Sequence, residues 1–461
     1  MRPRVSDGVW AASAGLAARI ACAVWGSARF PPAEDGHFYH VVAGRIARGL
    51  GYTWLWPDGA VTYAAHYPVG YPALIGAVYA ITGPVPGAAM AFNAVLGAAA
   101  VFAVHRVAAE AATRTGALVA ALCVALHPGL VFYTPALMTE GVTASLLAIA
   151  AGLAVSARRA EGSRRGRVAA LAVVLGVATL VRPQSLLLAP LYGAVAVPPG
   201  SRGRAAWAAV LVTAGALFVC SPWTIRNCTR MKSCALVSVN VGWNLFIGAA
   251  EGATGAWVPL ERLGVPAECR TVWDEAAKDA CFLRAGTRAL AHDPLRWLSL
   301  VPRKLGETFD YAGAAGFYLH SSNPDAFGER AKVALGVAET AWERAVVALA
   351  LLAVARTDGP RPRLRRAVAL LSSLSLFARA GFIAHLGLLG AAGLLLGKGG
   401  LGLRPVVVLA AGTVLGTAIV HAAFFGAGRY SLVCFPALAA LAGTALTAES
   451  GVGDTDRSKE S

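Results

Sequence analysis

Two adjacent acids begin the part of the sequence that is best equipped for chemistry. Glu34 and Asp35 follow the first long apolar run, and Tyr39 comes four residues after Asp35. Carboxylates at a membrane boundary are costly unless they are solvated or used. A solvated start of a loop and a catalytic carboxylate therefore remain equally open, and Asp35 and Glu34 are candidate catalytic residues.

A third acid, Glu140, stands at the start of a different apolar run, directly after Thr139. Acids favour the N-terminal ends of helices and Thr is a common cap, so a purely structural role is one interpretation. The other interpretation is a second carboxylate in the same active site as Asp35.

Histidines near these acids raise the question of a metal site. His37 and His40 are three residues apart and would share a helical face beside Glu34 and Asp35. No ligand spacing that is diagnostic of a metal site is present, so we expect no metal and no required cofactor. A divalent ion held by His37 and His40 is the minor alternative.

The composition shows what must position these residues. Of 461 residues 57% are hydrophobic and 14% are charged, against roughly 25% charged in soluble domains. The 41 Lys+Arg outnumber the 25 Asp+Glu, and the excess lies in short clusters between apolar runs. Such clusters indicate membrane topology, whereas a nucleic-acid partner would need a basic face on a soluble domain. The sequence predicts an all-α polytopic membrane protein with no nucleic-acid partner.

About eleven to thirteen transmembrane helices are expected, since a spanning helix needs about 20 apolar residues. The apolar runs cover residues 8–28, 85–108, 116–132 and 141–157, a short pair on either side of Arg182-Pro183, 205–223, a span ending near 355, a hairpin at 367–396, 405–425 and 431–446.

Arginine clusters at 158–167, 202–204 and 361–366 fall on the side of the N-terminus when the runs are threaded alternately. The positive-inside rule makes that side cytoplasmic, so we expect a multi-pass protein of the inner (cytoplasmic) membrane with a periplasmic or extracytoplasmic active site. Tryptophans in the outer loops predict amphipathic helices at the headgroup level. The expected parts are a transmembrane module at 1–223 with a catalytic outer loop at about 30–84, a small extracytoplasmic region at 224–338, C-terminal helices at 339–448 and a polar cytoplasmic tail at 449–461.

Four of the eight cysteines lie in the long polar stretch, where an oxidising compartment permits disulfides. The expected pairs are Cys228 with Cys234 and Cys269 with Cys281, although four cysteines allow three pairings.

Six short motifs occur in order along most of the chain. The first outer loop combines Asp35 and Tyr39 with His66-Tyr-Pro-Val-Gly-Tyr-Pro72; the others are Pro135 to Glu140, Val181-Arg182-Pro183, Pro222-Trp-Thr-Ile-Arg226-Asn227, Asn240-Val-Gly-Trp-Asn244-Leu-Phe-Ile-Gly248 and Gly428-Arg429-Tyr430. Together they resemble the GT-C superfamily of membrane glycosyltransferases. Within it, bacterial relatives of protein O-mannosyltransferases and of the lipid A aminoarabinose transferase are the most similar.

The resemblance implies a GT-C-like fold and an inverting transfer of a sugar from a polyprenyl-phosphate donor. It makes Asp35 the general base on the acceptor and Glu140 a second acid that positions the acceptor or the base. Arginine suits the leaving phosphate, so Arg226 and Arg429 are the expected phosphate contacts.

Further substrate contacts are implied with less support from the sequence. Arg182 could instead snorkel at the end of a short hairpin. His66 falls near the position before Pro68 where relatives carry a Lys or Arg, and this sequence departs from them with Tyr67 directly before Pro68. Tyr39, Asn244 and Tyr430 complete the candidate substrate-binding residues.

The expected enzyme is a mannosyltransferase-like, hexosyl or pentosyl transferase of the cell envelope. Its partners are the donor lipid, the membrane and a glycan, lipid or protein acceptor. The rival function is a transporter or flippase of lipid-linked sugars. Transporters place polar residues near the bilayer midplane and show repeats, whereas these acids stand at loop edges and no repeat is evident.

Overall fold

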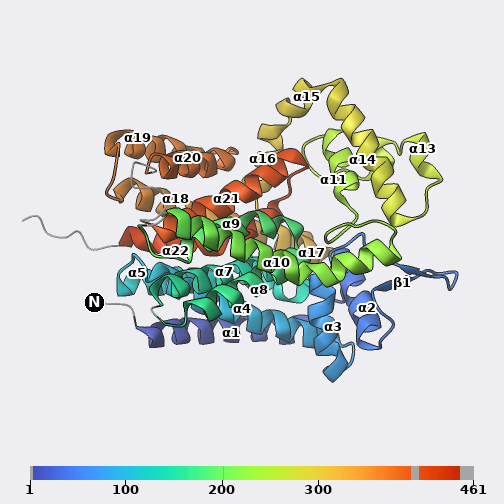
Figure 1. Ribbon diagram of the computed structural model, residues 1–461, viewed down its shortest axis with the longest axis horizontal. Helices are drawn as coiled ribbons and strands as arrows, with labels where there is room; N and C mark the ends of the chain where they lie inside the picture. Colours follow the sequence, from blue (N-terminus) through green and yellow to red (C-terminus); the bar gives the residue numbers. More distant parts are fainter. Residues whose placement is uncertain (1–3, 161, 201, 396–403, 447–461) are drawn as a thin grey trace, which may run out of the picture.

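The computed structural model describes residues 4–160, 162–200, 202–395 and 404–446, and it is built almost entirely of helices (Figure 1). Within these ranges, five helices are long and apolar enough to cross a membrane. They are α1 (Val5–Ser27), α4 (Pro86–Ala108), α7 (Thr139–Arg159), α10 (Arg202–Arg230) and α21 (Pro405–Ala423). The predicted all-α polytopic membrane fold is confirmed.

The other predicted spans form shorter, broken or more polar helices. These are α5 (Arg114–Ala125) with α6 (Pro128–Phe132), α8 (Arg164–Val181), α9 (Ala189–Val195), α18 (Glu329–Arg356), α19 (Pro362–Ser373), α20 (Gly381–Gly393) and α22 (Phe435–Gly443). Counting the bent α5–α6 pair as one, at most six helices in the described ranges meet the length and hydropathy needed for a span. The expected eleven to thirteen counted every apolar run, and several runs are too short or interrupted to meet that measure. The predicted tail at 449–461 lies outside the described residues.

The break between α5 and α6 shows how the bundle tolerates an interrupted helix. Pro128 cannot continue the hydrogen-bond ladder of α5, which leaves carbonyls at the end of that helix without helical partners. The buried guanidinium of Arg19 on α1 donates to Ala125 O at 2.9 Å and to Val124 O at 3.0 Å. The freed carbonyls are therefore satisfied inside the bundle.

Close helix contacts depend on small residues, as is usual in membrane bundles. Where α5 meets α22, a Cβ added to Gly116 would lie 2.3 Å from Gly443 O, so no larger residue fits without a shift.

The remaining elements gather at one end of the bundle, while α19 and the first turn of α1 lie toward the other (Figure 1). The loop expected outside the membrane at about 30–84 forms α2 (Asp35–Ala47), a hairpin of β1 (Thr53–Leu55) and β2 (Val61–Tyr63), and α3 (Gly70–Thr82). The hairpin is antiparallel, with Thr53 opposite Tyr63.

The region expected outside the membrane is a set of short helices with two disulfides. Its elements are α11 (Val241–Ala249), α12 (Leu260–Leu263), α13 (Ala267–Arg270), α14 (Glu275–His292), α15 (Pro294–Ser299), α16 (Val301–Phe309) and α17 (Ala314–Ser322). Cys228 is bridged to Cys234 and Cys269 to Cys281, with Cα atoms 4.2 and 5.8 Å apart. These are the two pairs suggested by the sequence.

Candidate active site

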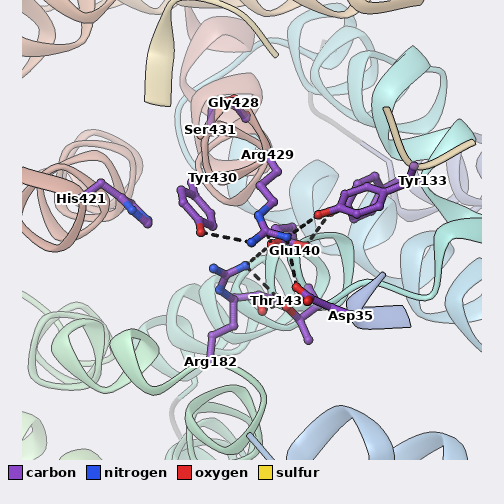
Figure 2. Close-up of polar contacts among 12 residues, drawn as sticks. Asp35, Tyr133, Glu140, Thr143, Arg182, His421, Gly428, Arg429, Tyr430 and Ser431 are labelled. Atoms are coloured by element: carbon purple, nitrogen blue, oxygen red, sulfur yellow. Dashed lines mark hydrogen bonds and ion pairs between the residues drawn. The ribbon is translucent and has the colours of Figure 1, made fainter. Parts of the chain in front are cut away.

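Two acids and two arginines from four distant segments meet at the end of the bundle where α2 begins (Figure 2). Asp35 is the first residue of α2 and Glu140 lies in the first turn of α7. Arg182 follows the last residue of α8, and Arg429 lies in the 3-10 segment η5 (Gly428–Val433). The sequence-derived candidates Asp35, Glu140, Arg182 and Arg429 thus form one charge cluster.

Glu140 is the buried anion at the centre of the cluster, with a side chain only 2% exposed. Its Oε1 lies 2.6 Å from Arg182 Nη1 and 3.3 Å from Arg429 Nε, while Tyr133 donates to Oε2 at 2.5 Å. A buried charge is tolerated only when it is paired and hydrogen-bonded, as here. Glu140 is suited to holding both guanidinium groups in place.

Asp35 is the more accessible carboxylate, with 26% of its side chain exposed. Its Oδ2 lies 3.2 Å from Arg429 Nη1, and Tyr67 donates a hydrogen bond to Oδ1 at 2.8 Å. Because each carboxylate oxygen can accept more than one hydrogen bond, an acceptor hydroxyl can still reach Asp35. Its exposure and its place beside Arg429 suit the predicted general base.

Tyr430 lies beside both guanidinium groups. Its ring centre is 4.9 Å from Arg182 Cζ and 5.2 Å from Arg429 Cζ, and its hydroxyl accepts from Arg429 Nη2 at 3.3 Å. On its other face the His421 ring stacks at 3.9 Å. Tyr430 therefore orients the arginines through cation–π contact.

Arg429 reaches the cluster because its segment comes very close to the loop that precedes α17. A Cβ added to Gly428 would lie 2.0 Å from Tyr311 O, so the neighbouring chain leaves room for glycine alone. The Arg429 guanidinium also donates to the Tyr318 hydroxyl on α17.

The cluster opens into a cavity of about 1280 Å³, which exceeds the roughly 300–1,000 Å³ of single small-molecule sites. Apolar lining residues come from the ends of α8 and α21 and from the region around α11 and α14. The formal charges along the lining are five acids and two arginines: Glu34, Asp35, Glu140, Glu261 and Asp279 against Arg182 and Arg429.

The lining also includes Tyr39, His66, Asn244 and Tyr430, so most of the predicted substrate-binding residues face one space. Glu34 lies at its rim, with positive φ at 52°, and accepts a hydrogen bond from Ser321 at 2.7 Å. Non-glycine residues with positive φ are uncommon, and strain of this kind often accompanies functional sites.

Arg226 is the predicted phosphate contact that the structure does not bring to the cavity. Its Nη1 donates to Ala64 O and its Nη2 to Tyr52 O, each at 2.9 Å, and its guanidinium lies 4.5 Å from the centre of the Trp223 ring. The guanidinium is used to hold the chain on either side of the β hairpin. Arg226 is therefore not among the residues that line the cavity, and its role as a phosphate contact stays a prediction.

The minor metal alternative gains no support from the geometry. Among the residues that the structure describes, no three His, Cys, Asp or Glu side chains form a group able to hold a metal ion. His40 Nδ1 instead shares a hydrogen bond with Tyr79 Oη at 2.8 Å.

Three tyrosines of the cluster were not among the candidates from the sequence. Tyr67 donates to Asp35, Tyr133 donates to Glu140, and Tyr318 accepts from Arg429. The sequence did carry a signal for a role of Tyr67, because Tyr67 directly precedes Pro68, where the resemblance implies a Lys or Arg. Tyr133 and Tyr318 had no comparable signal.

His66 lies in the cavity wall with its ring 5.2 Å from the Trp243 ring. Burial lowers the pKa of His66 to about 4, an effect that the nearby Asp35 carboxylate only partly offsets. With this pKa, His66 is neutral at pH 7 and carries no charge toward the cavity.

We expect His66→Gln to leave the shape of the pH–rate profile unchanged between pH 5 and 8. The measurement is turnover in the sugar transfer that the resemblance implies, taken across this pH range. A limb of the wild-type profile near pH 6 to 7 that disappears in the variant would contradict it.

Fold and site together define a helical membrane protein whose cavity pairs the carboxylates of Asp35 and Glu140 with Arg182 and Arg429. Residues 66–225 match the family model of dolichyl-phosphate-mannose-protein mannosyltransferases. This segment contains Tyr67, Glu140 and Arg182 of the site. Over this segment the match agrees with the resemblance to membrane glycosyltransferases of the GT-C superfamily.

Solved structures that are similar to the chain include two of an archaeal oligosaccharyltransferase from Archaeoglobus fulgidus. One is AglB in complex with an inhibitory peptide and a dolichol-phosphate, at 13% identity and a TM-score of 0.41, covering 95% of this chain and 50% of that one. The other is the apo form, at 13% identity and a TM-score of 0.43, covering 96% of this chain and 56% of that one. The chain spans about half the length of these structures. No curated protein sequence matches the chain significantly.

Proposed function

We propose that the protein transfers a sugar, a hexose or a pentose, from a polyprenyl-phosphate donor to an acceptor nucleophile. The transfer takes place on the outer face of the inner membrane and inverts the anomeric carbon. The observation that supports it is the 3.2 Å approach of the accessible carboxylate of Asp35 to Arg429, within a cavity that also holds Arg182.

The proposed reaction uses the cluster as follows. Asp35 accepts the proton of the acceptor hydroxyl or other nucleophile while the nucleophile attacks the anomeric carbon. The bond from that carbon to the phosphate oxygen breaks, and its electron pair leaves with the phosphate. Arg182 and Arg429 stabilise the charge of this leaving group, since guanidinium groups bind phosphate with two hydrogen bonds.

Glu140 serves the reaction without touching the acceptor. Its carboxylate is buried and already bonded to both arginines and Tyr133, so we assign it to holding the phosphate-binding groups. Placing this cavity on the outer face is supported by the arginine clusters, which the positive-inside rule assigns to the opposite face. The N-terminus is then cytoplasmic, and the acceptor is a glycan, a lipid or a protein.

The test is a transfer assay on the full chain purified in detergent, where no gradient or compartment exists. A labelled polyprenyl-phosphate sugar is incubated with a cell-envelope extract as the source of acceptor, and released polyprenyl phosphate is measured. We expect release that depends on the extract and is lost in Asp35→Asn. Binding of donor with no release across hexose and pentose donors would favour the rival transporter. Mass spectrometry of lipid that copurifies with the protein would identify the carrier.

A further inference from the structure

Tyr67 donates a hydrogen bond to Asp35, and the proposed reaction gives no role to Tyr67 or to the loop that carries it. We propose that Tyr67 is a positioning residue for the base Asp35, and that Glu275 acts on Asp35 through the loop that carries Tyr67. This inference rests on the proposed function. It gives the extracytoplasmic helices a role in the reaction: α14 sets the orientation of a carboxylate on α2.

The contact between Tyr67 and Asp35 fixes one of the two carboxylate oxygens. The phenol donates to Oδ1 at 2.8 Å, opposite the guanidinium of Arg429 on Oδ2. The Tyr67 ring is itself held by Phe38 at 4.8 Å and by Tyr39 at 5.5 Å between ring centres. A hydrogen bond to the ionised form of a carboxylate stabilises that form. The phenol therefore orients the carboxylate of the base.

The loop of residues 64–67 has no helix or strand of its own, and other elements bond to its backbone. The amides of Ala65 and His66 donate to Glu275 Oε2 at 2.6 and 3.0 Å. The carbonyl of Tyr67 accepts from the Tyr52 hydroxyl at 2.8 Å. On the other side of the loop, Arg226 donates to Ala64 O at 2.9 Å.

Glu275 is well placed to act as the anchor of this loop. It belongs to the first turn of α14, yet its carboxylate bonds to amides of a segment about 210 residues away rather than to its own helix. The helix is fixed by the Cys269–Cys281 disulfide and by Asp279, which accepts from Trp243 N at 3.0 Å. Movement of α14 would therefore be transmitted to Tyr67 and then to Asp35.

Several titratable groups surround Asp35. They are Glu34 and Tyr39 on α2, His66 and Tyr67 before α3, Glu140 on α7, Tyr318 on α17 and Arg429 in η5. Tyr67→Phe removes one hydrogen bond and leaves these other charges in place.

The first test is the pH–rate profile of Tyr67→Phe in the detergent transfer assay. We expect turnover to fall about tenfold at acidic pH, the scale of one hydrogen bond to a charged group. The acidic limb should move to higher pH by roughly one unit, because the ionised base loses a donor. The KM for the donor should stay within about twofold, since the phosphate-binding arginines are untouched. A purely structural role would lower the yield of folded protein but leave the limb in place.

The second test asks whether Glu275 acts through Tyr67. Glu275→Ala should shift the limb in the same direction, whereas Glu275→Gln keeps a carbonyl acceptor and should restore the wild-type profile. The double variant Tyr67→Phe with Glu275→Ala should be no worse than Tyr67→Phe alone, since both changes remove one interaction. The matched control is Glu268→Ala, an exposed acid of the same region that pairs with Arg288, and it should leave the profile unchanged.

Three results would overturn the inference. One is an unmoved acidic limb in Tyr67→Phe. Another is additive losses in the double variant, which would separate Glu275 from Tyr67. The third is failure of Glu275→Gln to rescue. The absence of transfer in the wild-type protein would instead reject the proposed function itself.

Discussion

Asp35→Asn is expected to abolish sugar transfer. Removing a general base costs about 10²- to 10⁴-fold in rate, and the amide that replaces the carboxylate cannot accept the acceptor's proton. Asn keeps the size of the side chain and can still contact Tyr67 and Arg429, so expression and donor binding should stay close to wild type. Transfer in detergent and binding of labelled donor measure the two effects separately.

The control for this variant is the adjacent acid. Glu34→Gln should be milder, because Glu34 lies at the cavity rim and pairs with Ser321 rather than with Arg429. Near wild-type turnover of Asp35→Asn would reject Asp35 as the base, and equal losses in both variants would point to a shared electrostatic role.

Arg429→Ala is expected to lose the donor step. Arg429 is the one side chain in the described cavity that contacts both acids, at 3.2 Å to Asp35 and 3.3 Å to Glu140. Its charge-assisted bonds contribute roughly 1.5 to 3 kcal/mol each, so activity should fall about tenfold or more. Arg429→Lys keeps the charge but not the two-pronged geometry, and it should weaken the donor step without abolishing it.

Donor affinity and turnover of both Arg429 variants are measured against Arg330→Ala, an exposed arginine at the start of α18 that does not line the cavity. Unchanged donor affinity in Arg429→Ala would contradict the proposed phosphate contact. Labelling of a cysteine at position 429 from the cytoplasmic side would contradict the proposed topology.

Much of the fold could be predicted because membrane helices leave strong signals in one sequence. The apolar runs at 8–28, 85–108 and 405–425 correspond to α1, α4 and α21 within a few residues. The number of full spans could not be predicted, because hydropathy does not show where a run is interrupted. Pro128 causes such a break. The bond that tolerates it joins Arg19 to Ala125 O, two residues 106 positions apart in the sequence.

The candidate site was partly predictable for a related reason. Asp35, Glu140 and Arg429 belong to short motifs whose order along the chain could be recognised. Tyr67 and Tyr318 act through partners 32 and 111 residues away, and no local pattern shows such a pairing. The motif around Arg226 gives the position of a guanidinium in the sequence, and it does not show that this group donates to Ala64 O and Tyr52 O.

The surplus of acids along the cavity lining bears on how a donor arrives. With five acids and two arginines, the lining itself carries more formal negative than positive charge, so its side chains offer little attraction to a soluble anion such as a nucleotide sugar. Both arginines are already engaged by Asp35 and Glu140, which shortens the reach of their field further. A phosphate carried on a polyprenyl chain needs no such attraction, because the membrane confines its diffusion to two dimensions. The rate of encounter would then follow the density of the carrier in the bilayer, and it would respond little to the ionic strength of the surrounding solution.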